Sequence, residues 1–459
     1  MPYLFQGVTL KQLYFVTQFL LQMKVLKFGG TSVGSASRIK KLIEIINPHQ
    51  TQIIVLSAIA GTTNSLVEIS KSFSSNESQK GIIMLKDLRK QYDELIEELH
   101  HDNNYKQQSI NLINYHFGLI ENLSADIVTT AEEKIILAQG ELISTGLFYN
   151  YLQEIGISAK LLSALTFMKI DENNEPIISY IQEKLLPQID ANNTPTIYIT
   201  QGYICRNTFN NIDNLRRGGS DFSASLIGAA IKAEEIQIWT DIDGMHNNDP
   251  RVVTGTKPIA QLSFQEAAEL AYFGAKILHP QSIFPAQKYN IPVRLLNTLE
   301  PDKKGTLISE KGQEKEGVQA IAAKNDITVI HIHSSRMLMA YGFLRKVFEV
   351  FERYKTPIDM ITTSEVAVSI TIDDEFYLKE ILADLSVFGE VSSYNNKTIV
   401  CVVGNFKKNS HSYAARILDA VKHLPIQMIS YGGSDFNVSF LLDTEYKTEA
   451  LRSLHSRLF

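Results

Sequence analysis

Short apolar runs alternate with longer amphipathic stretches from residue 23 to about residue 307. The apolar runs predict buried strands at 25–28, 53–57, 196–200, 236–240 and 293–296. The longer stretches predict helices, because apolar residues recur at helical spacing and, at 80–150, Lys and Glu cover the opposite face. Strands that alternate with helices predict an α/β sandwich. The polar segment SKSFSSNESQK at 70–80 predicts an exposed loop.

The C-terminal part of the chain contains an internal repeat. PIDMITTSEVAVSITID at 357–373 has a counterpart in PIQMISYGGSDFNVSFLLD at 425–443. An amphipathic helical stretch precedes each copy and another follows it, at 342–354 and 375–388 and again at 413–424 and 445–458. Two strands between two helices, repeated once, predict two ferredoxin-like βαββαβ modules.

A polar stretch, EKGQEKEG at 310–317, separates the two patterns and is typical of a linker. We therefore expect one domain at 23–309 and a tandem of modules at 318–459. Residues 1–22 include an apolar run, but only Lys11 precedes it and no small-residue cleavage site follows. We expect 1–22 to be a dispensable extension, with Met23 as an alternative start, and not a targeting signal.

Composition narrows the range of partners. The chain has 459 residues, 44% of them hydrophobic, and a net charge of −6, which argues against nucleic acid or a membrane surface as partner. No run approaches the roughly 18 apolar residues needed to cross a bilayer. The only cysteines, Cys205 and Cys401, lack the spacing of a metal site and indicate a reducing compartment. We expect a cytoplasmic protein without a metal site of its own.

The stretch KVLKFGGTSVGS at 24–35 joins a predicted strand to a predicted helix. Gly29 and Gly30 allow positive φ and the close approach of a ligand, and the unpaired amides at a helix start favour an anion. Lys27 precedes the glycines, so this is not a Walker loop. On these residues alone, a tight turn with a solvated lysine is an equally good interpretation.

Four further stretches carry chemistry: QGELIS at 139–144, LRRGGSDFSASLIGAA at 215–230, IWTDIDGMHNNDPR at 238–251 and FGAKILHP at 273–280. The RRGGSD segment repeats the opening pattern of a cation, two glycines and a hydroxyl. Separated cations, glycine-rich helix starts and loop carboxylates suit a nucleoside triphosphate with magnesium and a small anionic second substrate. Arg251 and Lys276, taken singly, are more often surface or ion-pairing residues.

Taken together, these motifs resemble those of the aspartate kinases (aspartokinases), most closely the monofunctional, lysine-sensitive type. The resemblance runs from residue 24 to residue 458 and rests on KFGGTSV, VLSAIAGTTN, QGELIS, QGYI, RRGGSD, WTDIDG with DPR, FGAKILHP and ITTSEV. It implies an amino acid kinase fold followed by two ACT modules. It also implies phosphorylation of the β-carboxylate of L-aspartate by ATP with Mg²⁺, the first step of lysine, threonine and methionine biosynthesis. Inhibition by L-lysine and a homodimer or dimer of dimers through the ACT modules are implied as well.

The resemblance assigns roles to individual residues. Lys27 would neutralise the transferring γ-phosphate, and Asp221 would hold that lysine in place. Further nucleotide contacts would come from Gly29, Gly30, Thr240, Asp241, His246, Arg251 and Lys276. L-Aspartate would meet Glu141 with its α-ammonium and Arg217 with its α-carboxylate, and the pocket would be completed by Ser57, Thr63, Tyr203, Gly218, Gly219 and Ser220. The effector would be lined by Met337, Gly342, Phe343, Leu344, Ile358, Asp359, Thr363, Ser364 and Glu365.

Two alternatives stay open. One is another amino acid kinase, acting on glutamate or N-acetylglutamate, although the ACT pair and the Glu141/Arg217 pair argue against it. The other is a non-catalytic amino-acid sensor, which is favoured only by His246, where the family has an aromatic residue. A fused homoserine dehydrogenase is excluded for this chain, which contains no GxGxxG loop.

Overall fold

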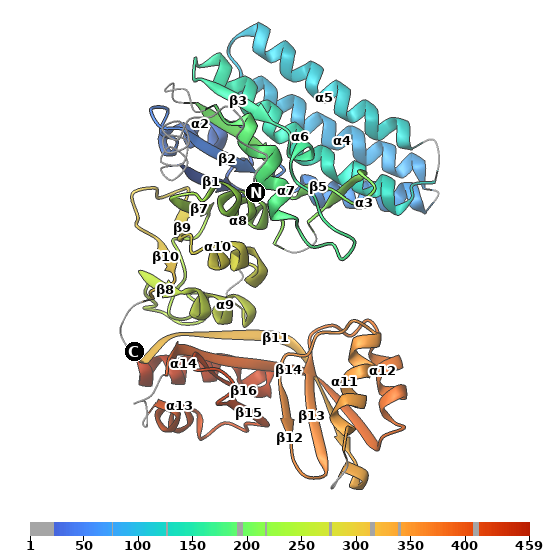
Figure 1. Ribbon diagram of the computed structural model, residues 1–459, viewed down its shortest axis with the longest axis vertical. Helices are drawn as coiled ribbons and strands as arrows, with labels where there is room; N and C mark the ends of the chain where they lie inside the picture. The colour runs from blue at the N-terminus through green and yellow to red at the C-terminus, as the bar shows by residue number, and fades with distance from the viewer. Residues whose placement is uncertain are drawn as a thin grey trace, which may run out of the picture. The chain divides into compact units, whose positions relative to one another are not determined.

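The computed structural model describes residues 23–75, 77–124, 127–190, 196–215, 218–274, 278–312, 317–337, 341–406 and 413–459. The predicted extension at 1–22, the site residues Arg217 and Lys276, and residues 313–316 of the predicted linker lie outside these ranges. The chain forms two compact units (Figure 1). The first comprises Met1–Met245, Ala260–Phe264 and Ile277–Gly312, and the second comprises His246–Ile259, Gln265–Lys276 and Gln313–Phe459.

The first unit is built on an eight-stranded sheet with the order β3-β4-β2-β1-β7-β9-β10-β8. Its strands are β1 (Lys24–Phe28), β2 (Gln52–Leu56), β3 (Ala159–Leu162), β4 (Ile197–Gln201), β7 (Glu235–Thr240), β8 (Gln261–Ser263), β9 (Val293–Asn297) and β10 (Thr306–Ser309). Neighbouring strands are parallel except β9 and β10. The five predicted strands are confirmed, each within one residue at either end. A separate hairpin pairs β5 (Ile204–Arg206) with β6 (Ile212–Asn214).

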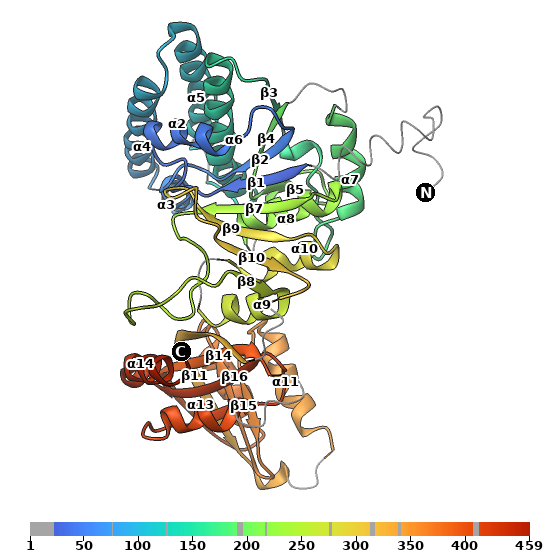
Figure 2. The same ribbon diagram turned by 90° about the vertical axis from the view of Figure 1, so that its left-hand side faces the viewer.

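Helices cover both faces of this sheet (Figure 2). One face packs against α2 (Ala36–Ile45), α3 (Thr62–Ser74), α4 (Ser78–Leu99), α5 (Asn103–Leu123) and α6 (Thr130–Glu154). The other face packs against α8 (Gly219–Ile231), beside α7 (Ile178–Leu185) and α10 (Phe284–Lys288). Because both faces are covered, β2 and β4 are buried along their whole length. This confirms the predicted α/β sandwich.

The exposed loop predicted at 70–80 is wrong. Helix α3 continues to Ser74, and α4 begins at Ser78. Phe73 is buried, and its ring lies so close to Gly81 of α4 that a Cβ at Gly81 would overlap it. The serines hide this contact in the sequence, because Ser70 and Ser72 are themselves buried.

The second unit contains an antiparallel six-stranded sheet with the order β12-β13-β11-β14-β16-β15. Its strands are β11 (Gly317–His333), β12 (Ile361–Thr363), β13 (Ala367–Ile372), β14 (Glu390–Asn405), β15 (Met428–Tyr431) and β16 (Asn437–Asp443). Its helices are α11 (Phe343–Arg353), α12 (Leu378–Leu385), α13 (Tyr413–Val421), α14 (Lys447–Leu458) and, from Gln265 onward, α9 (Phe264–Tyr272). None of the helices in the described ranges is long and apolar enough to span a membrane.

The two predicted modules are present, and they share their long strands. The first consists of β12, β13, the second half of β11 and the first half of β14, with a core under α11 and α12. The second consists of β15, β16 and the other halves of β14 and β11, with a core under α13 and α14. The second module therefore takes one of its four strands from the start of β11, which precedes the first module in the chain. The first module is inserted within the second, a connection that the repeat did not predict.

The burial of Phe73 leads to a test of the corrected helix boundary. Truncation of Phe73 to alanine should lower the free energy of unfolding of the first unit by about 3–5 kcal/mol, because a fully buried aromatic ring is lost. Urea unfolding followed by the fluorescence of Trp239, the only tryptophan, measures this. The control is Phe209→Ala, since that ring is 82% exposed. Equal, small effects of the two substitutions would contradict the assignment.

Candidate active site

Lys27 and Asp221 form a mostly buried ion pair at the carboxyl ends of the parallel strands of the first sheet. Lys27 is the fourth residue of β1, which lies between β2 and β7, and its Nζ is 2.7 Å from Asp221 Oδ1 in the first turn of α8. Their side chains are 12% and 17% exposed. A Cβ at Gly29 would lie 3.5 Å from this ammonium, so the lysine folds back over the glycine loop. The carboxylate of Asp221 therefore fixes the ammonium of Lys27 at the start of that loop.

The two glycine pairs serve different physical needs. Neither Gly29 nor Gly30 adopts the positive φ that glycine allows. Gly30 is needed for close packing, because a Cβ there would lie 2.8 Å from the carbonyl oxygen of Ala58. Gly218 and Gly219, by contrast, have φ values of 72° and 47° and open helix α8 in the left-handed region.

Glu141 is a buried carboxyl on α6. Its Oε1 accepts a hydrogen bond from the backbone N–H of Ala58 at 3.3 Å, and its Oε2 has no partner among the described residues. Burial raises the pKa of this carboxyl to about 8. A buried, half-satisfied carboxyl is costly unless a cationic or donor group of a ligand completes it.

Tyr203 and Ser57 follow two other strands of the sheet, and each contacts a serine of α8. Tyr203 follows β4 with a positive φ of 65°, and its N–H donates to Ser223 Oγ at 2.9 Å. Burial first, and then the Glu141 carboxyl, raise the pKa of the Tyr203 hydroxyl to about 12. Ser57, which follows β2, donates its hydroxyl to Ser220 Oγ in α8 at 2.9 Å.

These contacts bring predicted residues together because β1, β2 and β4 are parallel and end at one edge. Lys27, Ser57 and Tyr203 come from those strand ends, and Ser220 and Asp221 come from the start of α8. Thr63 is the second residue of α3. Arg217, the expected partner of a ligand carboxylate, lies outside the described residues.

On the predicted nucleotide side, Thr240 ends β7 and donates to Asp241 Oδ1 at 3.1 Å. Sequence reasoning missed Thr298, which follows β9 at the same edge of the sheet. Its hydroxyl donates to the carbonyl oxygen of Thr240 at 3.0 Å and lies 3.3 Å from Ser32 Oγ of the first glycine loop. The position after a parallel strand was the signal that could have found it.

His246 and Arg251 belong to the second unit. His246 Nδ1 lies 3.2 Å from Thr256 Oγ1, and the guanidinium of Arg251 bonds Asp249 through two nitrogens at 2.9 and 2.8 Å. The Arg251 side chain is 81% exposed. The ion pair foreseen as its alternative role therefore exists, and contact with nucleotide stays a prediction for both residues.

The predicted effector residues surround two turns of the first module. Met337, Gly342, Phe343 and Leu344 precede or open α11, Ile358 and Asp359 precede β12, and Thr363, Ser364 and Glu365 end β12 and turn toward β13. Gly342 has a φ of 77° and caps α11. Asp359 is fully buried at its side chain, whereas Thr363, Ser364 and Glu365 are exposed.

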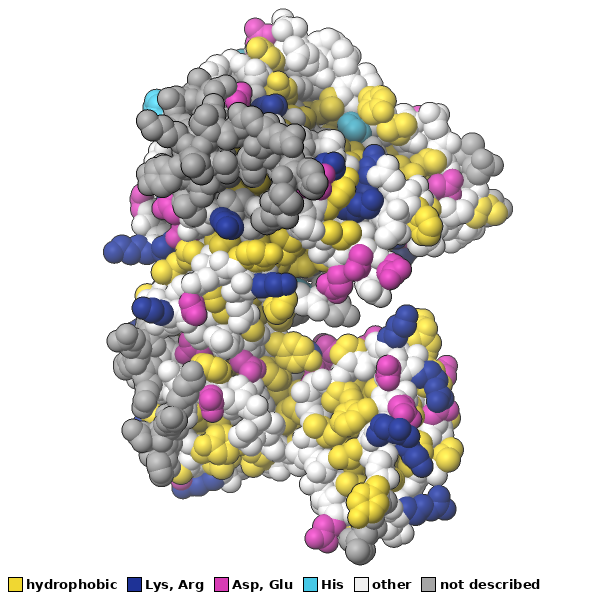
Figure 3. All heavy atoms as spheres, in the orientation of Figure 1, with side chains coloured by type: hydrophobic (Ala, Val, Ile, Leu, Met, Phe, Trp, Pro, Cys, Tyr) yellow, Lys and Arg dark blue, Asp and Glu magenta, His cyan; other side chains and the backbone are white. Residues whose placement is uncertain are grey.

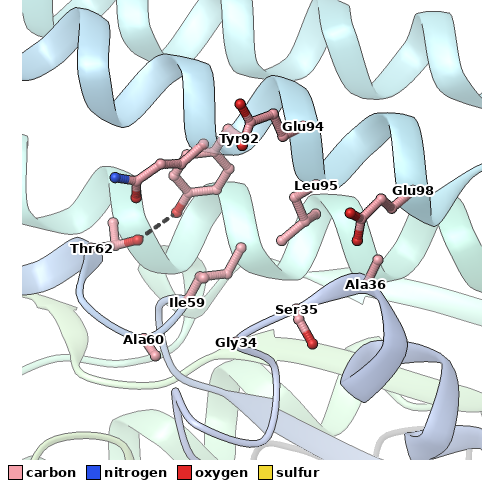
Figure 4. Close-up of a pocket in the computed structure, with 11 residues that line it drawn as sticks. Gly34, Ser35, Ala36, Ile59, Ala60, Thr62, Tyr92, Glu94, Leu95 and Glu98 are labelled. Atoms are coloured by element: carbon pink, nitrogen blue, oxygen red, sulfur yellow. Dashed lines mark hydrogen bonds between the residues drawn. The ribbon is translucent and has the colours of Figure 1, made fainter.

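A cavity of about 220 Å³ lies behind the glycine loop, against α4 (Figure 4). Gly34, Ser35 and Ala60 line one side, and Leu95 and other α4 residues line the other. The hydroxyls of Tyr92 and Thr62 meet beside it at 2.9 Å. No predicted substrate or nucleotide residue lines this cavity, so it is separate from the cluster around Lys27.

Comparison with protein families gives two matches. The Amino acid kinase family matches residues 22–297, and the ACT domain matches residues 400–458. The second match covers the part of β14 that belongs to the second module, together with α13, β15, β16 and α14.

Similar proteins extend this over nearly the whole chain. Lysine-sensitive aspartokinase 3 of Escherichia coli K12 is 31% identical over 454 residues, which cover 95% of this chain and 99% of that protein. The chloroplastic aspartokinase 1 of Arabidopsis thaliana is 32% identical, covering 95% and 80%. Among solved structures, E. coli aspartokinase III with aspartate and ADP (R-state) matches with a TM-score of 0.83, 32% identity and coverage of 95% and 100%. The same enzyme with lysine and aspartate (T-state) matches with a TM-score of 0.77, 32% identity and coverage of 95% and 99%.

The raised pKa of Glu141 predicts a pH-dependent cost. Between its ordinary value of 4.5 and about 8, the folded chain keeps a proton on Glu141 that the unfolded chain has lost. The free energy of unfolding therefore falls with rising pH, relative to a Glu141→Gln variant, by at most about 1.4 kcal/mol per pH unit. Urea unfolding of both proteins across this window measures the difference. Parallel curves would show that Glu141 ionises at its ordinary value.

Proposed function

This chain belongs to the aspartokinases of the amino acid kinase family, and we propose that it transfers the γ-phosphoryl group of ATP to the β-carboxylate of L-aspartate at the cluster around Lys27. The observation that carries the assignment of the site is the buried Lys27–Asp221 pair at the start of the glycine loop. Phosphoryl transfer depends on fixed positive charge at the moving group; Lys27 supplies the charge and Asp221 fixes its position.

The chemistry needs little else from the protein. The attacking β-carboxylate has a reference pKa of about 3.9, so it is ionised at neutral pH and requires no general base. Lys27 neutralises charge on the phosphoryl group, and Asp221 holds the lysine so that it does not reorganise during the reaction. The Gly29 backbone lies beside the same ammonium, and its N–H donates to the carbonyl oxygen of Trp239 at 3.3 Å, so we propose the N–H of Gly30 as the loop donor to the phosphate.

Recognition of aspartate follows from the unsatisfied carboxyl. Glu141 Oε2 receives the α-ammonium of the substrate, which replaces the missing hydrogen-bond partner and favours the ionised carboxylate. Ser57 and Ser220 offer hydroxyls beside it, Thr63 and Tyr203 complete the wall, and Gly218 and Gly219 open the helix. Arg217 is proposed for the α-carboxylate, because a guanidinium binds carboxylates through two parallel bonds.

The nucleotide enters, in this proposal, as its Mg²⁺ complex, with the metal ion carried by the phosphates as part of the substrate. Thr240 and Asp241 at the end of β7 are proposed contacts, together with His246, Arg251 and Lys276. We propose residues 23–309 as the catalytic domain, 310–317 as a linker and 318–459 as the ACT regulatory region. The two free, buried cysteines suit a cytoplasmic location.

L-Lysine is the proposed feedback effector. Asp359, a buried acid in the predicted effector set, provides charge for its side-chain ammonium. We propose a homodimer or dimer of dimers through the ACT modules. Exposed apolar side chains on the first module support this: Tyr341, Leu344, Phe348, Phe376 and Tyr377 are 36% to 103% exposed, and Figure 3 shows apolar side chains on the face that carries α11 and α12.

The assignment is tested by trapping the acyl phosphate with hydroxylamine in the presence of ATP, Mg²⁺ and L-aspartate. Hydroxamate should form with aspartate and not with glutamate or N-acetylglutamate. Lys27→Ala should reduce turnover by about 10²–10³-fold or more, because one preorganised charge at the phosphoryl group is lost.

The matched control is Lys24→Ala, which removes a lysine from the same strand that pairs only loosely with Glu234 at 4.0 Å. It should keep nearly full turnover. Equal turnover of the two variants would remove Lys27 from the catalytic role. Absence of hydroxamate from the wild-type protein would favour the sensor alternative, and a signal with glutamate would favour another amino acid kinase.

The effector assignment predicts a second separation. Asp359→Asn should leave hydroxamate formation intact and raise the lysine concentration for half-inhibition by about tenfold, because a charge-assisted bond to the effector is lost. Asp384→Asn is the control, since Asp384 lies in the same module and pairs with Arg353 outside the effector set. Unchanged inhibition in Asp359→Asn would exclude Asp359 from the site.

A further inference from the structure

Asp359 is the centre of a polar cluster within the second unit. Its Oδ1 accepts hydrogen bonds from the ammonium of Lys324 and from the hydroxyl of Tyr272, both at 2.6 Å. Lys324 also pairs with Asp373 at 2.8 Å, and its ammonium lies 4.3 Å from the centre of the Tyr272 ring. One carboxylate oxygen thus holds both a lysine and a tyrosine.

The other oxygen of Asp359 lacks a partner. Oδ2 is buried without a hydrogen bond from any described residue, and the side chain is 0% exposed. Burial raises the pKa of this carboxyl, although Lys324 and Tyr272 oppose the shift. A buried carboxylate oxygen without a donor is costly, so an arriving ammonium group would be stabilised there.

The repeat in the second module provides an internal comparison. Gln427 in PIQM occupies the position of Asp359 in PIDM, and the backbone N–H of each donates to the facing strand at 2.9 Å. The Gln427 amide donates to Asp443 at 3.0 Å, and Lys397 pairs with the same carboxylate. The second module therefore keeps a lysine and a strand-end aspartate but replaces the buried acid with a neutral amide. Of these two equivalent positions, the first module alone offers a charge to a cationic ligand.

Tyr272 reaches the cluster from the catalytic part of the sequence. It is the last residue of α9, which follows β8 directly in the chain and belongs to the second unit from Gln265 onward. Two further contacts join the same segment to the six-stranded sheet. Glu269 accepts a hydrogen bond from Asn437 of β16 at 2.6 Å. Gly274 packs directly on the carbonyl group of Ala323 in β11, where a Cβ would overlap the carbonyl oxygen. The FGAKILHP stretch continues from this helix.

We propose that Tyr272 couples the effector site to catalysis. An effector ammonium at Asp359 Oδ2 draws the carboxylate away from its two donors on Oδ1, and the hydrogen bond from Tyr272 weakens. The packing of α9 on the six-stranded sheet then changes, and the chain transmits this change to β8, the strand of the eight-stranded sheet that directly precedes α9. Tyr272 is a positioning residue in this scheme. The inference rests on lysine being the effector, as proposed above.

The test separates binding from inhibition. Tyr272→Phe removes the hydroxyl and keeps the ring. Calorimetric titration of the full chain should give a lysine dissociation constant no weaker than that of wild type, because Asp359 Oδ2 is untouched and a competing donor on Oδ1 is gone. Without lysine, hydroxamate formation should fall toward the level of the lysine-inhibited wild type, and the further drop that lysine causes should shrink by about tenfold. If the Tyr272 hydroxyl were only structural, Tyr272→Phe would lower the thermal stability, and lysine binding and lysine inhibition would change together.

Tyr354→Phe is the matched control, because Tyr354 also donates to an aspartate, Asp384 at 3.1 Å, within the same module and away from α9. It should bind lysine and be inhibited like wild type. Full inhibition of Tyr272→Phe, or loss of its lysine binding, would overturn the coupling role while leaving lysine as the effector of the wild-type enzyme. A wild-type protein that binds no lysine would overturn both proposals.

Discussion

A partly buried ammonium needs a carboxylate within reach, and the Lys27–Asp221 pair ties the catalytic cluster to the fold. The lysine is fixed by the central position of β1, and the aspartate by the start of α8, so the pair links a strand to the helix that packs across it. The glycine loop closes over the lysine, and the β2 and β4 ends bring Ser57 and Tyr203 to the same edge. Displacement of either charged residue would leave the other unpaired in a region from which water is largely excluded.

The protein uses the same electrostatic arrangement twice. Glu141 in the first unit and Asp359 in the second are buried acids with one satisfied oxygen and one oxygen that lacks a described partner. Burial raises the pKa of both. Each buried carboxyl therefore costs free energy in the unliganded protein, and a bound ammonium group would lower this cost. Both proposed ligands, aspartate and lysine, carry such a group. Selectivity between the two sites must come from their other walls, and the hydroxyls around Ser57 differ from the aromatic and lysine neighbours of Asp359.

Much of this could be predicted because strong local patterns agreed with the tertiary structure. The five predicted strands, out of eight in the first sheet, were each flanked by helical stretches, and apolar runs such as that of β2 carry their own signal. Lys27 and Asp221 were found because glycines and charges cluster around them. The helix through Ser70 and Phe73 was missed, because buried serines resemble a loop in sequence. Thr298 was missed because a single threonine carries no motif. The contact between Tyr272 and Asp359 joins residues 87 positions apart, and no local pattern encodes it.

The sharing of β11 and β14 has a consequence for the order in which the chain is completed during synthesis. The start of β11 is made early, yet its partner in the second module, the later half of β14, emerges only after the whole first module has been translated. The first module can close its own core while the early half-strand stays without a neighbour. The second module forms last. A ribosome that stalls between β14 and β16 would release a chain with one complete module and an exposed strand edge, the kind of edge that promotes aggregation.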